Sequence, residues 1–117
     1  QTLAAHEGVQ WMLGDVAKDI QIGRLLTMQA AWKLDQGDFA RSDISIAKIH
    51  AADTLHKAAD TAIQLLGARG YYKDTIVEWI YRYARQARLV DGASEIHKMV
   101  LSRAYLSEGQ DFFRWGV

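Results

Sequence analysis

The chain has 117 residues, of which 50% are hydrophobic and 24% are charged. This balance is typical of one globular domain and excludes a largely disordered chain. Fourteen basic residues offset fourteen acidic ones, so no overall charge draws the chain to nucleic acid, and we expect no such partner. Because cysteine is absent, disulfides and thiolate metal sites are excluded, and we expect a cytoplasmic location.

No stretch contains the roughly 18 consecutive apolar residues that a membrane-spanning helix needs, so no transmembrane segment is predicted. The N-terminus also lacks the charged start and the apolar run of a signal peptide. Because the sequence begins with Gln1 rather than with methionine, we interpret it as a fragment or a processed product.

The first predicted helix runs from about Leu3 to Gln36 and ends at the turn residues Gly37 and Asp38. Helical spacing places apolar residues on two of its faces. One face carries Val9, Leu13, Val16, Ile20, Thr27, Ala31 and Leu34, and the other carries Trp11, Ile22, Leu25 and Trp32. A helix that is apolar on two sides needs neighbours on two sides. We therefore expect self-association, or packing against a further domain.

The second predicted helix continues to about Leu66, with Ser42 or Asp43 as its N-terminal cap. Its expected core stripe consists of Ile44, Ala47, Ala51, Leu55, Ala58, Ala62 and Leu65. The alanines would allow a neighbouring backbone to approach closely. Gly67 is expected to stop this helix in the left-handed region of backbone conformation.

The third predicted helix runs from Thr75 to about Arg88. Thr75 and Glu78 have the spacing of a capping box, in which side chain and backbone satisfy each other's hydrogen bonds. The dipeptide Asp91-Gly92 then predicts a turn.

The fourth predicted helix is capped by Ser94 and continues to about Leu106. An aromatic tail follows it, with Phe112, Phe113 and Trp115. Residues 1–117 therefore predict one all-α domain, an antiparallel four-helix bundle with two long and two shorter helices.

The residues alone favour structural roles over ligand sites. His6, His50, His56 and His97 lack the spacing of a bundle metal site, so no metal site is predicted. The segment from Gly67 to Gly70 is more typical of a helix stop than of a phosphate cradle. Arg82, Arg85 and Arg88 favour a solvated face, with a ligand-facing strip as the alternative.

Asp91 has two interpretations. It precedes a helix, where unpaired N–H groups favour an ionised carboxylate, and such a group can act as a general base. Spacing alone favours a simple Asp-Gly turn.

Several short motifs, taken in order, resemble the acyl-CoA dehydrogenase family over nearly the whole chain. Residues 62–71 (AIQLLGARGY) are similar to the family's glutamine-and-glycine loop, and Arg82 and Arg85 follow it. Residues 88–96 (RLVDGASEI) resemble the acid-glycine segment that opens the last helix, and Arg103 matches its closing arginine. Residues 4–7 and 29–32 are similar to stretches of the preceding long helices.

The resemblance implies an FAD-dependent oxidoreductase that converts an acyl-CoA thioester to a 2-enoyl-CoA. It implies that Asp91 is the catalytic base that removes the α-proton, while a hydride leaves the β-carbon for the flavin. The backbone N–H of Asp91 becomes a candidate donor to the thioester carbonyl. The positions expected to contact FAD are Gln64, Gly67, Ala68, Gly70, Gly92, Ala93 and Glu95. The resemblance implies that Gln64, Gly67 and Gly70 reach the adenosine diphosphate part of the FAD bound by a neighbouring subunit.

The chain departs from the family pattern at four positions. Most relatives have Glu where this chain has Asp91, although a subset has Asp. Ala68 replaces a Gly, Ala93 replaces a Thr, and Tyr83 replaces an Asp.

The family's N-terminal helical domain and middle β-domain have no counterpart in the chain. We therefore expect a C-terminal portion that is inactive alone, in a homo-oligomer (dimer or tetramer) whose electron acceptor includes an electron-transfer flavoprotein as a candidate. The alternative is a non-catalytic helical oligomerisation module.

Overall fold

The computed structural model describes residues 2–114. Within this range the chain is helical and contains no strand. Its elements are η1 (Leu3–Ala5), α1 (Glu7–Asp35), α2 (Arg41–Leu66), α3 (Ala68–Tyr71), α4 (Val77–Gln86), α5 (Ser94–Glu108) and η2 (Gly109–Phe113). The all-α prediction with two long and two shorter helices is confirmed, and the four-residue helix α3 is an addition to it. Trp115 of the predicted aromatic tail lies outside the described residues.

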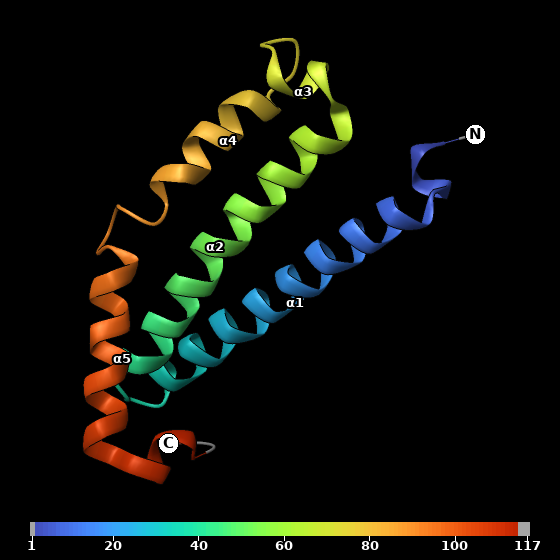
Figure 1. The fold of residues 1–117 in the computed structure, drawn as a ribbon. Helices are drawn as coiled ribbons and strands as arrows, with labels where there is room; N and C mark the ends of the chain where they lie inside the picture. Colours follow the sequence, from blue (N-terminus) through green and yellow to red (C-terminus); the bar gives the residue numbers. More distant parts are fainter. Residues whose placement is uncertain (1, 115–117) are drawn as a thin grey trace.

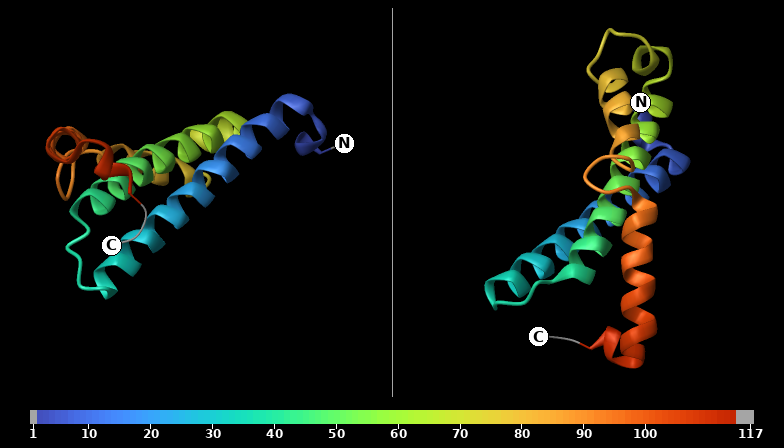
Figure 2. Two further views of the ribbon diagram at one scale, coloured as in Figure 1. Left: turned by 90° about the horizontal axis from the view of Figure 1, so that it is seen from below. Right: turned by 90° about the vertical axis from the view of Figure 1, so that its left-hand side faces the viewer.

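Helix α2 is the centre of the arrangement (Figure 1). Its backbone runs close to those of α1, α3, α4 and α5, whereas among the described helices the backbone of α1 runs close to α2 and η1 alone. Helices α4 and α5 follow one another along α2 in the opposite direction (Figure 2). The result is elongated, with extents of 52 × 28 × 25 Å.

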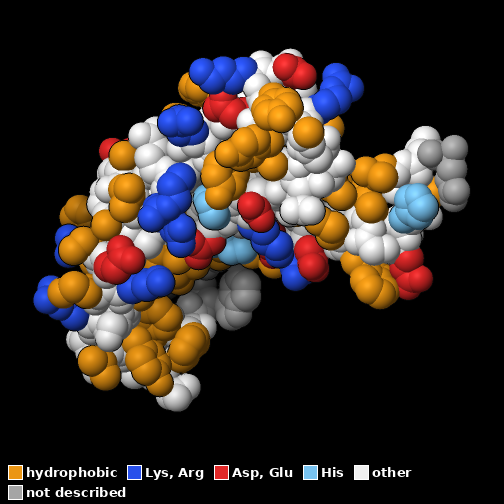
Figure 3. Space-filling model, turned by 45° about the horizontal axis from the view of Figure 1, so that its top comes forward, with side chains coloured by type: hydrophobic (Ala, Val, Ile, Leu, Met, Phe, Trp, Pro, Cys, Tyr) orange, Lys and Arg blue, Asp and Glu red, His pale blue; other side chains and the backbone are white. Residues whose placement is uncertain are grey.

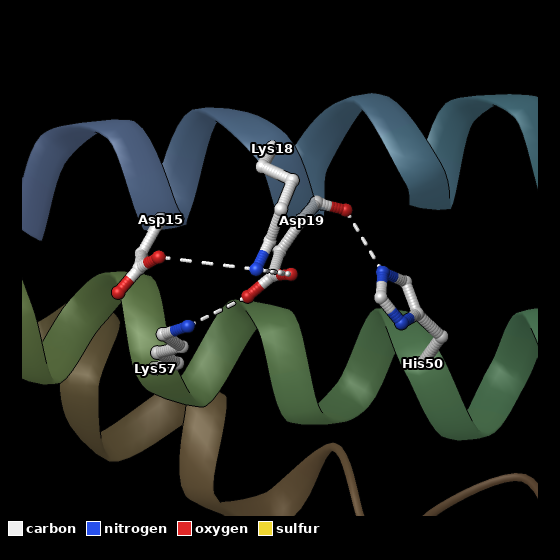
Figure 4. Close-up of polar contacts among 5 residues, drawn as sticks. All are labelled: Asp15, Lys18, Asp19, His50 and Lys57. Atoms are coloured by element: carbon white, nitrogen blue, oxygen red, sulfur yellow. Dashed lines mark hydrogen bonds and ion pairs between the residues drawn. The ribbon is translucent and has the colours of Figure 1, made fainter.

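The contact between α1 and α2 is polar at its middle (Figure 4). Lys57 donates a hydrogen bond of 2.8 Å to the carboxylate of Asp19. That bond holds the pKa of Asp19 below its ordinary value and raises the pKa of Lys57. His50 donates from Nε2 to the carbonyl oxygen of Asp19 at 2.8 Å, and its ring lies beside Gly23. His50 therefore contributes to the contact between α1 and α2.

The most buried residues are small. The buried apolar residues are Ala30, Ala40, Ala52, Ala59 and Ala84, and the buried polar ones are Ser45 and Ser94. On α2 the buried positions Ser45, Ala52 and Ala59 lie one residue after Ile44, Ala51 and Ala58 of the predicted stripe. Within the predicted stripe, Ile44 and Ala51 are exposed and the other five residues are half-buried. The most buried positions lie beside the stripe, because α2 has neighbours on more than one side. Small side chains allow these neighbours to approach closely.

On α1 the predicted apolar face is only partly covered. Val9 and Val16 are half-buried, whereas Leu13, Ile20 and Leu34 are exposed. Trp11 and Trp32 of the second face are also exposed, at 67% and 48%. Hydrophobic side chains are spread over the surface between charged ones (Figure 3). Exposed apolar area of this kind is typical of surfaces that contact other protein.

The predicted turn at Gly37 is confirmed, with φ of +87°. Gly67 also has the expected positive φ of +63°, although its ψ of −138° lies outside the left-handed helical region. The predicted turn at Asp91 and Gly92 is confirmed by φ values of +54° and +87°.

The predicted caps of α2 were wrong. Helix α2 begins at Arg41 and has no side-chain cap. Instead, Asp43 accepts a hydrogen bond of 3.0 Å from Lys33 of α1, and the Asp38 carboxylate accepts from the backbone N–H of Ala40 at 2.8 Å.

The other two predicted caps were also wrong. Helix α4 begins at Val77, and Thr75 Oγ1 accepts from the Val77 N–H at 3.3 Å rather than forming a box with Glu78. Ser94 is the first residue of α5, and its hydroxyl is buried without a described hydrogen-bond partner. It is packed in the interior and does not cap the helix.

Candidate active site

The loop between α4 and α5 carries Asp91 on an unusual backbone. Its φ of +54° lies in the left-handed region, where among non-glycine residues Asn and Asp occur most readily. The residue is exposed. No described residue donates a hydrogen bond to its carboxylate, and no described acceptor takes its backbone N–H. Both groups are therefore free to meet a ligand.

Asp91 does not cap α5, because the N-cap residue is Ala93 and no side chain caps this helix end. The loop is closed instead by its own backbone, where the Ser94 N–H donates to the Arg88 carbonyl at 3.1 Å. The Nε atom of Arg88 is buried without a described partner. The three arginines that were predicted to share one face therefore do not lie on a single surface. Arg88 belongs to this loop, whereas Arg82 is exposed on α4.

Helix α2 supports the loop at two places. Lys48 donates from Nζ to the Ala87 carbonyl at 2.6 Å, at the end of α4, where a cation also suits the helix dipole. One turn earlier on α2, Ser45 Oγ lies 3.0 Å from His97 Nδ1. The other ring nitrogen of His97, Nε2, lies 3.4 Å from the carbonyl oxygen of Asp91. Sequence reasoning missed these three supporting residues, because Ser45 and His97 are 52 residues apart.

The predicted cofactor positions at the end of α2 form a second region. Gln64 and Ala68 are exposed. A side chain on Gly67 would meet no atom within 4 Å, so the surface there is open. Gly70 is different, because it is buried and a Cβ would lie 2.9 Å from the Ile63 Cα. This close approach of α3 to α2 explains the glycine by packing.

The predicted positions beside Asp91 lie at the start of α5. Gly92 is exposed with φ of +87°, Ala93 is half-buried, and Glu95 is exposed in the first turn. These three residues lie beside Asp91 but away from the Gln64 region. Helix α4, of 10 residues, separates the two regions (Figure 1), a span of about 15 Å.

A groove of about 770 Å³ lies beside the Gln64 region, between α2, α3 and α4. Its lining includes Tyr71, Tyr72, Arg82 and Arg85. Two of the three predicted arginines therefore face a concave surface, which leaves the ligand-facing alternative open for them.

Two kinds of feature are absent from residues 2–114. No helix in this range has the length and hydropathy required to span a bilayer. In the same range no three side chains of the His, Cys, Asp or Glu type are grouped so that they could hold a metal ion.

Comparisons with known proteins match most of the chain. The family model described as acyl-CoA dehydrogenase, C-terminal domain, matches residues 1–106. The (R)-benzylsuccinyl-CoA dehydrogenase of Thauera aromatica is 36% identical over 111 residues, which make up 94% of this chain and 27% of that protein. The acryloyl-CoA reductase (NADH) of Anaerotignum propionicum is 33% identical over 101 residues, or 86% of this chain and 26% of the relative.

A solved structure has the same fold. The acyl-CoA dehydrogenase of Slackia heliotrinireducens superposes with a TM-score of 0.87 at 26% identity, over 92% of this chain and 29% of that one. The chain thus spans only about a quarter of the length of the relatives that it matches. The family model matches residues 1–106, and the fold matches that of a solved acyl-CoA dehydrogenase. The chain therefore belongs to the acyl-CoA dehydrogenase C-terminal domain family.

Proposed function

We propose that this chain is the C-terminal portion of a longer FAD-dependent oxidoreductase that acts on the CH–CH bond of acyl-CoA thioesters. We assign Asp91 as its catalytic base. The observation that carries the assignment is the exposed Asp91 carboxylate on a left-handed backbone, without a described hydrogen-bond donor. A base that is not already engaged can accept a substrate proton once the substrate comes within hydrogen-bond distance.

In this proposal the Asp91 carboxylate takes the α-proton of the thioester. The electron pair left behind spreads onto the thioester carbonyl oxygen, and the free N–H of Asp91 donates to that oxygen and stabilises its charge. FAD, when bound, supplies the chemistry that takes up the hydride from the β-carbon. We expect the residues that select the length of the acyl group to lie mostly outside this chain. The names of the relatives include both a dehydrogenase and a reductase, so membership of the family does not by itself fix the physiological direction.

The open surfaces of the chain fit the proposed cofactor. The exposed amide of Gln64 and the open backbone at Gly67 are free to contact the FAD of a neighbouring subunit, with Ala68 beside them. Gly92, Ala93 and Glu95 are proposed to contact the FAD of the same subunit. The start of α5 carries no side-chain cap, and its Ser94, Ile96 and His97 N–H groups donate to backbone carbonyls. The Glu95 N–H has no described acceptor and is proposed to face an anionic group.

Further protein is proposed to cover α1. Trp11, Leu25 and Met28 are exposed at 67%, 57% and 64%, which is unusual for large apolar side chains that stay in water. We assign this surface to the rest of the longer protein and to a second copy of it. The isolated chain is expected to be inactive, and the electron acceptor is proposed to be a separate flavoprotein.

The test replaces Asp91 with Asn in the full-length, FAD-loaded protein. Asn keeps the size and suits the backbone, but it cannot accept the proton. We expect flavin reduction by acyl-CoA to slow by about 10²–10⁴-fold, with the FAD content unchanged. The thioesters are butyryl-CoA, octanoyl-CoA, isobutyryl-CoA and 3-phenylpropionyl-CoA, and bleaching of the flavin absorbance is followed by stopped flow.

The control is Asp74→Asn, the same change at an exposed residue in the segment before α4, which should leave the rate unchanged. The assignment of Asp91 fails if the Asp91 variant reduces its flavin as fast as the wild type. The whole proposal fails if none of the four thioesters reduces the wild-type flavin.

A further inference from the structure

We propose that His97 and Ser45 are positioning residues that hold the Asp91 loop through a hydrogen-bonded chain from α2. This inference rests on the proposed function of Asp91 and extends it to two residues outside the set proposed to contact substrate or FAD. The chain runs from Ser45 on α2, through the ring of His97 on α5, to the carbonyl oxygen of Asp91.

The partners fix the direction of each hydrogen bond. The Asp91 carbonyl oxygen can only accept, so His97 Nε2 carries the hydrogen and donates across 3.4 Å. In the neutral ring Nδ1 is then an acceptor, and the Ser45 hydroxyl donates to it across 3.0 Å. Ser45 is buried, with 3% of its surface exposed, so its hydroxyl has little access to water. Each of the polar groups that link Ser45, His97 and the Asp91 carbonyl therefore has a partner inside the protein.

The ring of His97 also touches the loop by packing. A Cβ on Gly92 would lie 3.0 Å from His97 Nε2 and 3.6 Å from two ring carbons. The ring therefore fills the space that a side chain at the residue after Asp91 would occupy. A hydrogen bond of 3.4 Å is longer than the usual 2.9–3.0 Å for this donor and acceptor, and the position of the ring beside Gly92 is a second observation that places His97 against the loop.

The Asp91 side chain has no anchor of its own. No described residue donates to its carboxylate, so the carboxylate is placed by the backbone that carries it. That backbone is held from α2 on both sides, by Lys48 at the Ala87 carbonyl and by the Ser45–His97 chain at the Asp91 carbonyl. Since a displacement of about 1 Å can slow a reaction by roughly 10²-fold, loss of this support should affect proton removal.

The experiment separates the two links of the chain with two substitutions of His97. Gln places its amide nitrogen close to the position of Nε2, so His97→Gln retains a donor for the Asp91 carbonyl. Asn reaches only to the position of Nδ1, so His97→Asn loses that donor but keeps a group beside Ser45. Ser45→Ala removes the hydroxyl and leaves the ring without its second partner. The matched control is His56→Gln, at a half-buried histidine packed on Tyr81 of α4.

The first measurement does not depend on catalysis. Hydrogen exchange of the peptide spanning residues 88–97 is followed by mass spectrometry in the full-length protein, with and without FAD. Because the Ser94 N–H closes the loop onto Arg88, its exchange reports loop opening. We expect exchange to be fastest in His97→Asn, intermediate in Ser45→Ala, and close to wild type in His97→Gln and His56→Gln.

The second measurement uses whichever of the four thioesters the wild-type protein oxidises fastest, with deuterium on its α-carbon. We expect kcat of His97→Asn to fall about tenfold, equivalent to about 1.4 kcal/mol, with KM unchanged. The α-deuterium isotope effect should rise, because a displaced base makes proton removal more rate-limiting. A purely structural role would lower the fraction of active protein and leave the isotope effect unchanged.

The outcomes distinguish this inference from the proposed function. If Asp91→Asn abolishes flavin reduction but His97→Asn matches His56→Gln in exchange and isotope effect, the positioning role is wrong and the base assignment stands. Equal behaviour of His97→Asn and His97→Gln also overturns it. If Asp91→Asn has no effect, or no thioester reduces the wild-type flavin, the proposed function fails and this inference fails with it.

Discussion

The two sides of α2 are built on different chemistry. Toward α1, its contacts include two charged pairs, Lys57 with Asp19 and Lys33 with Asp43. Toward α4 and α5, its contacts use a buried hydroxyl at Ser45 and close packing against the fully buried Ala84. Charged pairs fix the position of a helix but tolerate small shifts, whereas close-packed small residues do not. The side that carries the Asp91 loop is therefore the more closely determined one.

The largest expected effect comes from enlarging the packed side. Ala84 has no exposed surface, so Ala84→Leu inserts three heavy atoms where there is no room. We expect a loss of about 1–3 kcal/mol in the free energy of unfolding, measured by hydrogen exchange of the α2 and α4 amides in the full-length protein.

The counterpart on α1 is Ala17→Leu, at an exposed residue of a helix. It should change the free energy of unfolding by no more than about 0.5 kcal/mol. An equal loss at both positions would remove the contrast between the two sides and would show that other protein closely covers Ala17.

Two glycines with the same φ allow a more specific comparison. Gly37, in the turn between α1 and α2, and Gly92, in the Asp91 loop, both have φ of +87°. A Cβ at Gly37 meets no atom within 4 Å, whereas one at Gly92 lies 3.0 Å from the His97 ring. Gly37→Ala should cost about 1 kcal/mol for the backbone alone, and Gly92→Ala roughly twice that because the ring must also move. Urea unfolding of both variants checks this, and equal costs would mean that the ring yields freely.

The smallest expected effect is at the charged contact. The Lys57 hydrogen bond lowers the pKa of Asp19 below its ordinary value of 3.8, so its stabilising contribution is present above that pH and is lost as the pH falls through the lowered value. The pKa of Lys57 is raised above 10.5, so its contribution is present below that pH and is lost above it.

Asp19→Asn should therefore lower the unfolding temperature throughout the neutral range, and the difference from wild type should close in acid. Asp15→Asn is the control, since Asp15 makes only an exposed contact of 3.8 Å with Lys18. A difference between wild type and Asp19→Asn that persists well below pH 3.8 would show that the effect is not due to charge.

Local backbone signals predicted the ends of the elements well. Glycine at positions 37, 67 and 92 marked three turns, and each has positive φ, because glycine adopts that conformation without strain. The absence of proline and the apolar spacing predicted the long helices. Side-chain caps were predicted badly, since Asp43 is bound to Lys33 of another helix and Ser94 is packed inside. Such competition depends on tertiary contacts that a local motif does not contain.

The candidate site was predicted only in part. The resemblance supplied Asp91 and the Gln64 region, and the structure places both on exposed backbone. The support from Ser45 and Lys48 has no signal in the sequence, because both residues lie on α2, far along the chain from the loop that they contact. A serine or a lysine in a helix is ordinarily a surface residue. Only the packing of α4 and α5 against α2 gives these two residues a role.

The left-handed backbone at Asp91 has a practical consequence for anyone who substitutes this residue. Alanine there would remove the acid and also bring a conformational penalty of about 1–2 kcal/mol, so a slower enzyme would be ambiguous. Asparagine tolerates the same φ of +54° and keeps the size and shape of the native side chain, while it removes the charge and replaces one acceptor oxygen with an NH2 group. The geometry of one peptide unit thus selects, before any kinetics are done, the replacement whose result can be attributed to chemistry.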